Sequence, residues 1–398
     1  MKDTVITDVR VVTPQEVINN ASVYLHKGRI GAVKKNGINW PQNYEVIDGK
    51  GKWLLPGIID LHNDAIEKEI EPRPNAVIPV GIALFSLETR LLSHGVTTIY
   101  HSFSFMEGES AVRTYDMVLS NVEEINRLKE HGLIRNYIHA RYDVTEHKFS
   151  PILVEMMKRQ QVKLLSFMDH TPGQGQYKNI EVYEKFIAKY RNLDEEAVKN
   201  NVIRRQAKKV DFQALKSLAE KARALSIPMA SHDDDSADKV RFMKKLGVTL
   251  SEFPIDMETA NFAAQEGLKV IVGGPNIIRG KSNSGNMSAM EAVKGGVVDI
   301  ICSDYMPAAI LNAIFVLHRR HNMPIHQAVN MGSLNPARAV GLEEELGSIE
   351  CGKRADLVMV NEVAGVPMVE MAFVDGRKVM EKGFFRRDNA PELKECLG

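Results

Sequence analysis

Histidines and aspartates stand at the ends of several apolar stretches of this chain. His62 and Asp64 end LPGIIDLHND, and His170 ends KLLSFMDH. His232 closes IPMASH, and Asp304 follows VDIICS. Imidazole nitrogens and carboxylate oxygens are ligands that zinc, manganese and iron share. If these stretch ends lie together in space, the residues predict a site for one or two divalent metal ions.

The spacing of His62 and Asp64 fits two ligands on one β-strand. Alternate side chains of a strand point the same way, so both residues can face one ion. Asp143, which ends the run NYIHARYD, is a further candidate metal ligand, and Arg141 in the same run is a candidate substrate ligand. Asp304 has a second expected role as the general base toward a bound water.

Other polar residues beside these runs can be explained by packing or by helix capping. His101 lies in GVTTIYHSF, which can place it in the site or in the packed barrel, whereas His139 is assigned to the core. We expect Asp233, Asp234 and Asp235 to cap and begin the helix that follows, where negative charge is favourable.

Two loops carry cations that suit an anionic substrate. Arg73 is held between two prolines, whose fixed φ limits the freedom of the loop. The stretch NIIRGKSNSGN is rich in small polar residues, whose exposed N–H groups can cradle phosphate oxygens. Its Asn276, Arg279 and Lys281 are candidate substrate ligands, since arginine can grip phosphate bidentately. The alternative is that both segments are ordinary surface loops.

Three glutamates follow His62 closely in the sequence. Glu67, Glu69 and Glu71 surround a lysine and precede Arg73. An anionic substrate would repel them. We therefore expect them to pair with Lys68 and Arg73 or to face solvent.

The elements that must position these residues alternate between strands and helices. Helical patterns such as SNVEEINRLKEHG separate most of the apolar runs, and a charged insertion, 174–209, forms either a solvated helical pair or a mobile lid. The runs predicted as strands span 58–62, 95–103, 136–144, 163–170, 227–234, 247–254, 269–276 and 298–305. Eight such units predict an α/β fold, a (β/α)8 TIM-like barrel, whose active site lies at the carboxyl ends of the strands.

Both ends of the chain are rich in strand formers and turn residues. The same mixture of β-formers and turn residues occurs near the start, in TVITDVRVV and SVYLHKGRIGAVKK, and near the end, in ADLVMV and MAFVDGRKVM. We expect residues 1–55 and 345–398 to form one composite β-sandwich domain. Residues 56–344 then form the hydrolase barrel.

Composition and charge limit the possible partners. The 398 residues contain 51 Lys and Arg against 51 Asp and Glu, so the net charge is zero. This balance gives no global field for nucleic acid. No apolar run approaches the length of a membrane span, and the start of the chain lacks the apolar core of a signal peptide. The three cysteines are interpreted as free thiols, and we expect a cytoplasmic protein with no nucleic-acid or membrane partner.

Several motifs together resemble the amidohydrolase superfamily. They are LPGIIDLHND, the run-end His170, His232 and Asp304, NPARAVGL and GSIECGKRADLVMV. The resemblance covers essentially the whole chain. It implies a metal-bearing barrel, a β-sandwich made from both chain ends, a divalent cofactor (zinc before manganese or iron) and a homo-oligomer. The chain departs from the usual pattern, because His-x-Asp replaces His-x-His and no lysine ends a strand where a carbamylated bridging ligand is expected. Asp143 can bridge two ions instead.

Further motifs narrow the resemblance to one subgroup. A family of triphosphate diphosphatases of phosphonate catabolism is similar in the motifs HND, EPRPN, MDHTPGQGQY, ASHDDD, SEFP, GGPNIIRGKSNSGN and CSDYMPAA. The resemblance implies hydrolysis of alpha-D-ribose 1-methylphosphonate 5-triphosphate to the 5-phosphate and pyrophosphate.

Two other functions remain open from the sequence. The first is an amidohydrolase or deaminase that acts on a cyclic amide or nucleobase, which needs the metal site but no anion pocket. The second is a non-catalytic, metal-binding scaffold. The complete set of candidate ligands argues against the scaffold.

Overall fold

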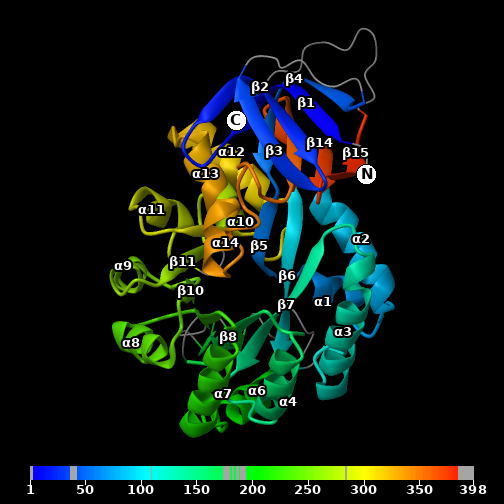
Figure 1. The fold of residues 1–398 in the computed structure, drawn as a ribbon. Helices are drawn as coiled ribbons and strands as arrows, with labels where there is room; N and C mark the ends of the chain where they lie inside the picture. The colour runs from blue at the N-terminus through cyan, green and yellow to red at the C-terminus, as the bar shows by residue number, and fades with distance from the viewer. Residues whose placement is uncertain are drawn as a thin grey trace.

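A computed structural model describes residues 3–35, 43–108, 110–173, 180–181, 183–184, 188, 194–282 and 285–383. The described chain forms a barrel of parallel strands and a separate sheet that joins the two chain ends. In Figure 1 the blue N-terminal and red C-terminal strands lie side by side above the barrel. Both parts of the predicted fold class are thereby confirmed.

Eight parallel strands form the barrel in the order of the sequence. Asn63 and Asp304 form a bridge between the first and last strands, which nearly closes the barrel. The backbone N–H of Asp304 donates to the carbonyl of His62 at 3.0 Å across this seam. The strands are β5 (Ile58–Asn63), β6 (Val96–Phe105), β7 (Arg135–Asp143), β8 (Leu164–Met168), β9 (Met229–His232), β10 (Leu250–Glu252), β11 (Lys269–Gly273) and β12 (Ile300–Cys302).

The barrel strands are buried on both faces, as their apolar runs predict. Every residue of β5 and β6 is buried, because side chains point alternately into the barrel and against the outer helices. Four of the helices begin at a residue whose side chain accepts a hydrogen bond from a backbone N–H of the first turn. These N-cap residues are Thr114 for α3, Asp211 for α7, Ser236 for α8 and Asp256 for α9. The described helices are α1 (Ala65–Ile70), α2 (Val80–Leu92), α3 (Tyr115–Leu128), the 3₁₀ turn η1 (Lys129–His131), α4 (Phe149–Lys158), α6 (Glu195–Gln206), α7 (Phe212–Ala224), α8 (Ala237–Leu246), α9 (Met257–Gln265), α10 (Gly274–Arg279), α11 (Ala289–Lys294), α12 (Ala309–His321), α13 (Ile325–Gly332) and α14 (Leu334–Ala339).

Seven strands from the two chain ends form one hydrogen-bonded sheet. Its order is β15-β14-β13-β4-β1-β2-β3, so the two ends meet where β13 pairs with β4. A core of its own, which includes Ile6, Val23, Leu357 and Phe373, lies in this sheet. The strands are β1 (Thr4–Val12), β2 (Val17–His26), β3 (Arg29–Lys35), β4 (Glu45–Pro56), β13 (Leu357–Val363), β14 (Val366–Val374) and β15 (Arg377–Glu381).

The charged insertion is described mainly at its C-terminal end, where α6 lies. Arg205 approaches the carbonyl of His170 at 3.5 Å, and Gln206 donates to the carbonyl of Pro172 at 3.1 Å. The end of the insertion thus contacts the loop that carries a candidate ligand. Residues 174–179, 182, 185–187 and 189–193 lie outside the described residues, so the lid remains a prediction.

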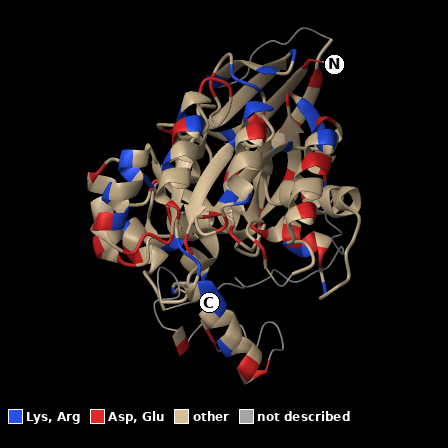
Figure 2. Ribbon diagram, turned by 90° about the horizontal axis from the view of Figure 1, so that it is seen from below, with Lys and Arg blue, Asp and Glu red and all other residues tan. Residues whose placement is uncertain are grey.

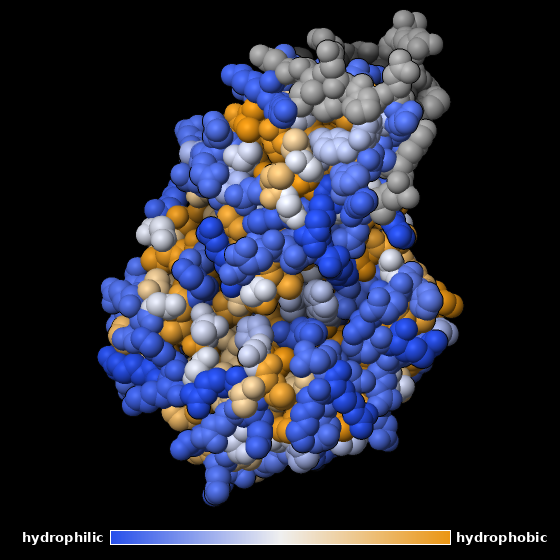
Figure 3. Space-filling model, viewed as in Figure 1, coloured by the Kyte–Doolittle hydropathy of each residue, from blue (hydrophilic) through white to orange (hydrophobic). Residues whose placement is uncertain are grey.

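The surface carries both signs of charge. In the view of Figure 2, Lys and Arg alternate with Asp and Glu over the helices. The face shown in Figure 3 is mostly hydrophilic, with apolar side chains in scattered groups. Among the described helices, none has the length and hydropathy that a membrane span requires.

Candidate active site

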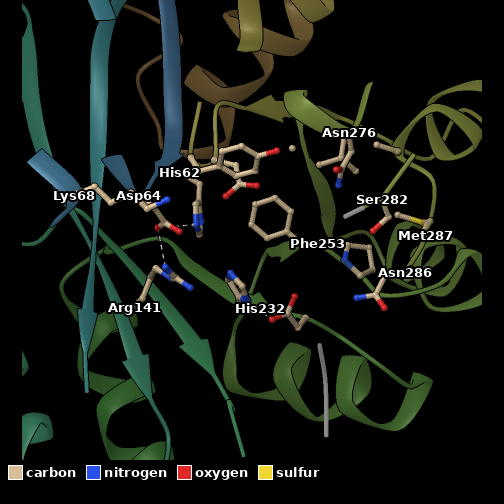
Figure 4. A pocket seen from close by; sticks show the side chains of 17 residues that line it. His62, Asp64, Lys68, Arg141, His232, Phe253, Asn276, Ser282, Asn286 and Met287 are labelled. Carbon is tan, nitrogen blue, oxygen red and sulfur yellow. Dashed lines mark hydrogen bonds and ion pairs between the residues drawn. The ribbon is translucent and has the colours of Figure 1, made fainter. Parts of the chain in front are cut away.

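A cavity of about 420 Å³ opens at the carboxyl ends of the barrel strands. Figure 4 shows His62, Asp64 and Arg141 on one wall and Asn276, Ser282, Asn286 and Met287 on the opposite wall, with the ring of Phe253 between them. His232 and Asp304 also line this cavity. The structure therefore brings residues of widely separated sequence runs into one site.

Three residues just beyond strand ends have left-handed backbones although none is glycine: two directly follow β9 and β10, and the third lies two residues after β12. Asp233, Phe253 and Asp304 have φ of 52°, 55° and 55°. Each backbone N–H still continues the strand ladder, for example from Asp233 to the carbonyl of Glu252 at 2.9 Å. This conformation costs roughly 1–2 kcal/mol per residue and gathers at functional sites. In this protein the left-handed conformation changes the direction of each of these side chains at the carboxyl end of its strand.

Glu252 organises the floor of the cavity. Its carboxylate accepts from His62 Nδ1 at 3.1 Å and from the Ser166 hydroxyl at 2.8 Å. His139 Nε2 lies 3.8 Å from the same carboxylate. Burial opposes protonation of His62, yet the Glu252 carboxylate, with Asp64, raises its pKa to about 10. The sequence analysis missed Glu252, which is the last residue of β10 and lies inside the SEFP motif.

His139 and His232 hold one ring nitrogen in place and leave the other for a ligand, whereas His62 Nε2 lies 3.4 Å from Asp64 Oδ1. The Nδ1 atoms of His62, His139 and His232 face Glu252, the Leu61 carbonyl and Asp233 respectively. A carbonyl can only accept, so His139 carries its proton on Nδ1 and has a lone pair on Nε2. In the described part of the chain, the buried Nε2 atoms of His139 and His232 have no hydrogen-bond partner.

Two groups of side chains in this region fit a metal ion. Their ligand atoms lie within 4.8 Å of one another in each group. In the second group, His170 Nε2 lies 3.8 Å from Asp233 Oδ2, which also accepts from His232 Nδ1 at 2.8 Å. Carboxylates that orient ligand histidines are typical of metal sites. The groups are His62, His139 and Glu252, and His170, His232 and Asp233.

Asp64 and Asp304 differ in their electrostatic surroundings. Burial would raise the pKa of Asp64, but Arg141 at 2.7 Å holds it well below its usual range. Burial raises the pKa of Asp304 to about 7, and the neighbouring Asp64 charge adds to this effect. Asp304 therefore changes protonation near neutral pH, as a general base or acid requires.

The predicted metal ligand Asp143 does not reach this cavity. Its carboxylate accepts from the Thr145 backbone at 3.0 Å and from the Thr145 hydroxyl at 2.7 Å. It lines a separate, small cavity with Arg205 and Lys208. The turn after β7 thus satisfies Asp143 locally and separates it from the other candidate ligands.

The predicted substrate ligands divide into two sets. Arg141 and Asn276 line the cavity. Arg73, Arg279 and Lys281 are exposed and are not among its lining residues. Other residues line the described walls in their place: Ser282 and Asn286, from the predicted stretch NIIRGKSNSGN, and Lys68 and Tyr305, which the sequence analysis did not select. Lys68 Nζ lies 5.7 Å from the centre of the Tyr305 ring.

The expected helix cap formed by Asp233, Asp234 and Asp235 is wrong. Ser236 is the N-cap of α8. Asp233 is turned toward His232, and the buried Asp234 instead accepts from two serine hydroxyls at 2.5 Å. The strand-end turn therefore takes the first two acids into the barrel before the helix begins.

The three glutamates do not pair with Lys68 or Arg73, but none of them lines the cavity, as expected. Glu67 binds Arg113 and Glu69 binds Arg90, while Glu71 accepts from Ser110. Their partners come from α2 and the loop after β6, which sequence neighbours alone do not predict.

His101 lies away from the cavity, where its Nε2 contacts Asn136 Oδ1 at 2.8 Å. Burial lowers the pKa of His101 to about 4. It therefore belongs to the packed barrel, the second of its two possible locations.

Comparisons with known proteins agree with this geometry. A model of the amidohydrolase family matches residues 166–379. The chain is 32% identical to alpha-D-ribose 1-methylphosphonate 5-triphosphate diphosphatase of Escherichia coli (strain K12), over 94% of this chain and 100% of the relative. Imidazolonepropionase of Thermoplasma acidophilum is 21% identical over 92% and 91% of the two chains. A structure of molinate hydrolase covers 98% of this chain and 99% of its own, with a TM-score of 0.66 at 15% identity, which shows the fold alone.

Proposed function

The chain belongs to the amidohydrolase family, and we propose that it hydrolyses alpha-D-ribose 1-methylphosphonate 5-triphosphate to the 5-phosphate and pyrophosphate in phosphonate catabolism. The observation that carries the proposal is the cavity itself. A buried cluster of histidines and carboxylates on one wall faces a wall of hydroxyl and amide groups, and Lys68 lies beside Asp64 on the first wall (Figure 4). The similarity to the diphosphatase supports the same substrate.

We propose one or two divalent ions as cofactor, with zinc ahead of manganese and iron. His170, His232 and Asp233 offer one set of ligands, and His62, His139 and Glu252 offer another. Asp64 and Asp304 line the same cavity and can complete either set. Bound ions would lower the pKa of water and stabilise charge on phosphoryl oxygens. We do not include Asp143 among the metal ligands, because its carboxylate accepts a hydrogen bond from Thr145 outside this cavity.

The side chains of the protein have separate tasks in this reaction. Asp304 accepts a proton from the attacking water, whose oxygen bonds to the α-phosphorus while the bond from that phosphorus to the α,β-bridging oxygen breaks. Pyrophosphate leaves with that oxygen. Arg141, oriented by Asp64, and Lys68 supply positive charge to the phosphoryl oxygens. Asn276 and Ser282 can donate hydrogen bonds to the chain of phosphates.

A cyclic amide is the second candidate substrate. The basic residues of the described lining are Lys68 and Arg141, and Arg141 is bound to Asp64. The three other predicted cations, Arg73, Arg279 and Lys281, are exposed outside the cavity. The similarity to imidazolonepropionase, although lower, extends over most of both chains. A weakly basic cavity with the same metal ligands suits amide hydrolysis.

The proposal predicts metal-dependent release of pyrophosphate. Metal-stripped protein would be supplied with zinc or manganese and assayed on the ribose 5-triphosphate and on a panel of cyclic amides. Pyrophosphate release with no amide turnover is the expected result. Amide turnover without pyrophosphate would replace the proposal with the second candidate.

We also propose a cytoplasmic location. Cys302 is buried and Cys351 is exposed, and both are free thiols. Free thiols are typical of proteins in reducing compartments.

A further inference from the structure

A second cleft, of about 850 Å³, lies against the terminal sheet at the opposite end of the barrel. Its lining includes the turn between β2 and β3, η1, the start of β7 and the turn between β14 and β15. Arg135 begins β7 on this side, whereas Arg141 near the other end of β7 lines the candidate active site. The rise of a strand, about 3.3 Å per residue, separates the two cavities by roughly 20 Å.

One wall of this cleft is a neutral network of arginines and carboxylates. Glu345 pairs with Arg29 at 2.9 Å and with Arg354 at 3.0 Å. Asp375 pairs with Arg354 at 2.9 Å and with Arg135 at 2.5 Å. Asp356, which lies outside the lining, also pairs with Arg135, so three carboxylates fix the three guanidinium groups and balance their charge.

The remaining basic side chains of the cleft are not neutralised. Lys27, Lys129, Lys163 and Arg377 line it and form no ion pair with any described residue. Glu130 is the one lining carboxylate outside the arginine network. The lining thus has an excess of positive charge, and the walls of a cleft concentrate its field.

Lys129 and Lys163 are two of these unpaired basic residues. Lys129 Nζ contacts Asn126 Oδ1 at 3.3 Å, and Lys163 Nζ contacts Gln160 Oε1 at 2.7 Å, so both partners are uncharged amides. Burial lowers the pKa of Lys163, and the charge of Lys129 lowers it further. The two ammonium groups therefore repel each other in partly buried positions, and a bound anion would remove this repulsion.

Tyr137 adds a hydrogen-bond donor to the same cleft. It lies two residues beyond Arg135 on β7, and the backbone N–H of Lys163 donates to the carbonyl of the next residue, Ile138, at 2.9 Å. Within the described chain, the Tyr137 hydroxyl has no hydrogen-bond partner. Two ammonium groups and a phenol hydroxyl are complementary to the several oxygens of a phosphate group.

We propose that this cleft binds a small phosphorylated anion, with Lys129 and Lys163 contacting a phosphate group and Tyr137 donating to it. The cleft volume is in the range of small-molecule sites. The zero net charge of the chain argues for a local ligand rather than an extended polyanion. The site is independent of the proposed reaction, because none of its lining residues lines the active-site cavity.

Protection of individual lysines from acetylation tests this site directly. The metal-loaded protein would react with acetic anhydride with and without inorganic pyrophosphate, at constant ionic strength, and each lysine would be quantified by peptide mass spectrometry. At ten times the Kd, acetylation of Lys129 and Lys163 should slow about tenfold, because roughly one site in eleven stays free. The exposed Lys34 and Lys35 on β3 are internal controls and should keep their rates.

Lys68 separates this proposal from the proposed function in the same experiment. Protection of Lys68 reports pyrophosphate in the active site, whatever happens at Lys129 and Lys163. Unchanged rates at Lys129 and Lys163, or equal slowing at Lys34 and Lys35, would overturn the second site.

A matched pair of variants provides a second measurement. Pyrophosphate binding to the Lys129→Gln, Lys163→Gln protein and to a Lys34→Gln, Lys35→Gln control would be followed by calorimetry. The first variant should lose one binding event per chain that the control keeps. Equal stoichiometry in both variants would overturn the proposal.

Discussion

The two walls of the candidate active site are built differently. On the strand wall, His62, Glu252 and His232 are buried and linked to fixed partners by hydrogen bonds. On the opposite wall, which we call the loop wall, Asn276 on α10 and Ser282 in the loop after α10 are partly exposed. Rigid strand ends suit groups that must keep a reacting geometry, and loops suit groups that select a substrate. We therefore expect the strand wall to control turnover and the loop wall, with Lys68, to control affinity.

The largest effect is expected from the Asp304→Asn protein. Loss of a general base typically costs about 10²–10⁴-fold in rate, so kcat should fall by that factor while KM changes little. Steady-state kinetics on the ribose 5-triphosphate measures both. Asp238→Asn, on the exposed start of α8, is the control. A normal kcat in the Asp304→Asn protein would remove Asp304 from the mechanism.

Glu252→Gln should weaken the metal site. Its carboxylate faces His62 Nδ1 and lies near His139, and loss of such an orienting carboxylate costs about 10–100-fold in metal affinity. Competition with a chelator, followed by metal analysis, measures this loss. Unfolding should be followed in parallel, because Glu252 is fully buried. Unchanged metal affinity would show that the strand wall does not hold the ion through these histidines.

The sequence predicted the strand wall better than the loop wall. His62, Asp64, His232 and Asp304 line one cavity because parallel strands end at one rim, so that run ends in the sequence become neighbours in space. Glu252 was missed, since one glutamate in a short apolar run resembles an ordinary rim residue.

Loop positions could not be predicted in this way. Arg279 ends α10 and is exposed, although its type and place in the sequence suited phosphate. Asp233 faces His232 because its φ of 52° turns it inward, which hydrophobic periodicity does not encode. Loop and rim side chains depend on individual backbone angles, whereas strand period fixes only which face a residue takes.

Lys68→Gln tests the affinity role outside the strand wall. A hydrogen bond or ion pair to a charged group contributes about 1.5–3 kcal/mol, so KM for the triphosphate should rise about tenfold or more while kcat changes little. Arg279→Gln is the matched control, because this residue does not line the cavity. A large rise in KM for Arg279→Gln and none for Lys68→Gln would reverse our assignment of the substrate contacts.

The smallest effect on turnover is expected from His101→Gln. Burial lowers the pKa of His101 from 6.5 to about 4, so the folded protein disfavours its charged form. The stability that comes from keeping His101 neutral is fully present above pH 6.5 and is lost as the pH falls toward 4. The free energy of unfolding should fall by about 3 kcal/mol over this range. Thermal unfolding of the variant should therefore depend less on pH in this window, with kcat within about twofold of the wild type. A large loss of kcat at neutral pH would give His101 a role in the site.

Hydrolysis in ¹⁸O-labelled water tests the central claim most directly. The strand wall is proposed to direct water to the α-phosphorus, so mass spectrometry should find the label in the ribose 5-phosphate product and none in pyrophosphate. Label in pyrophosphate, or release of orthophosphate, would place the attack on another phosphorus and contradict the account.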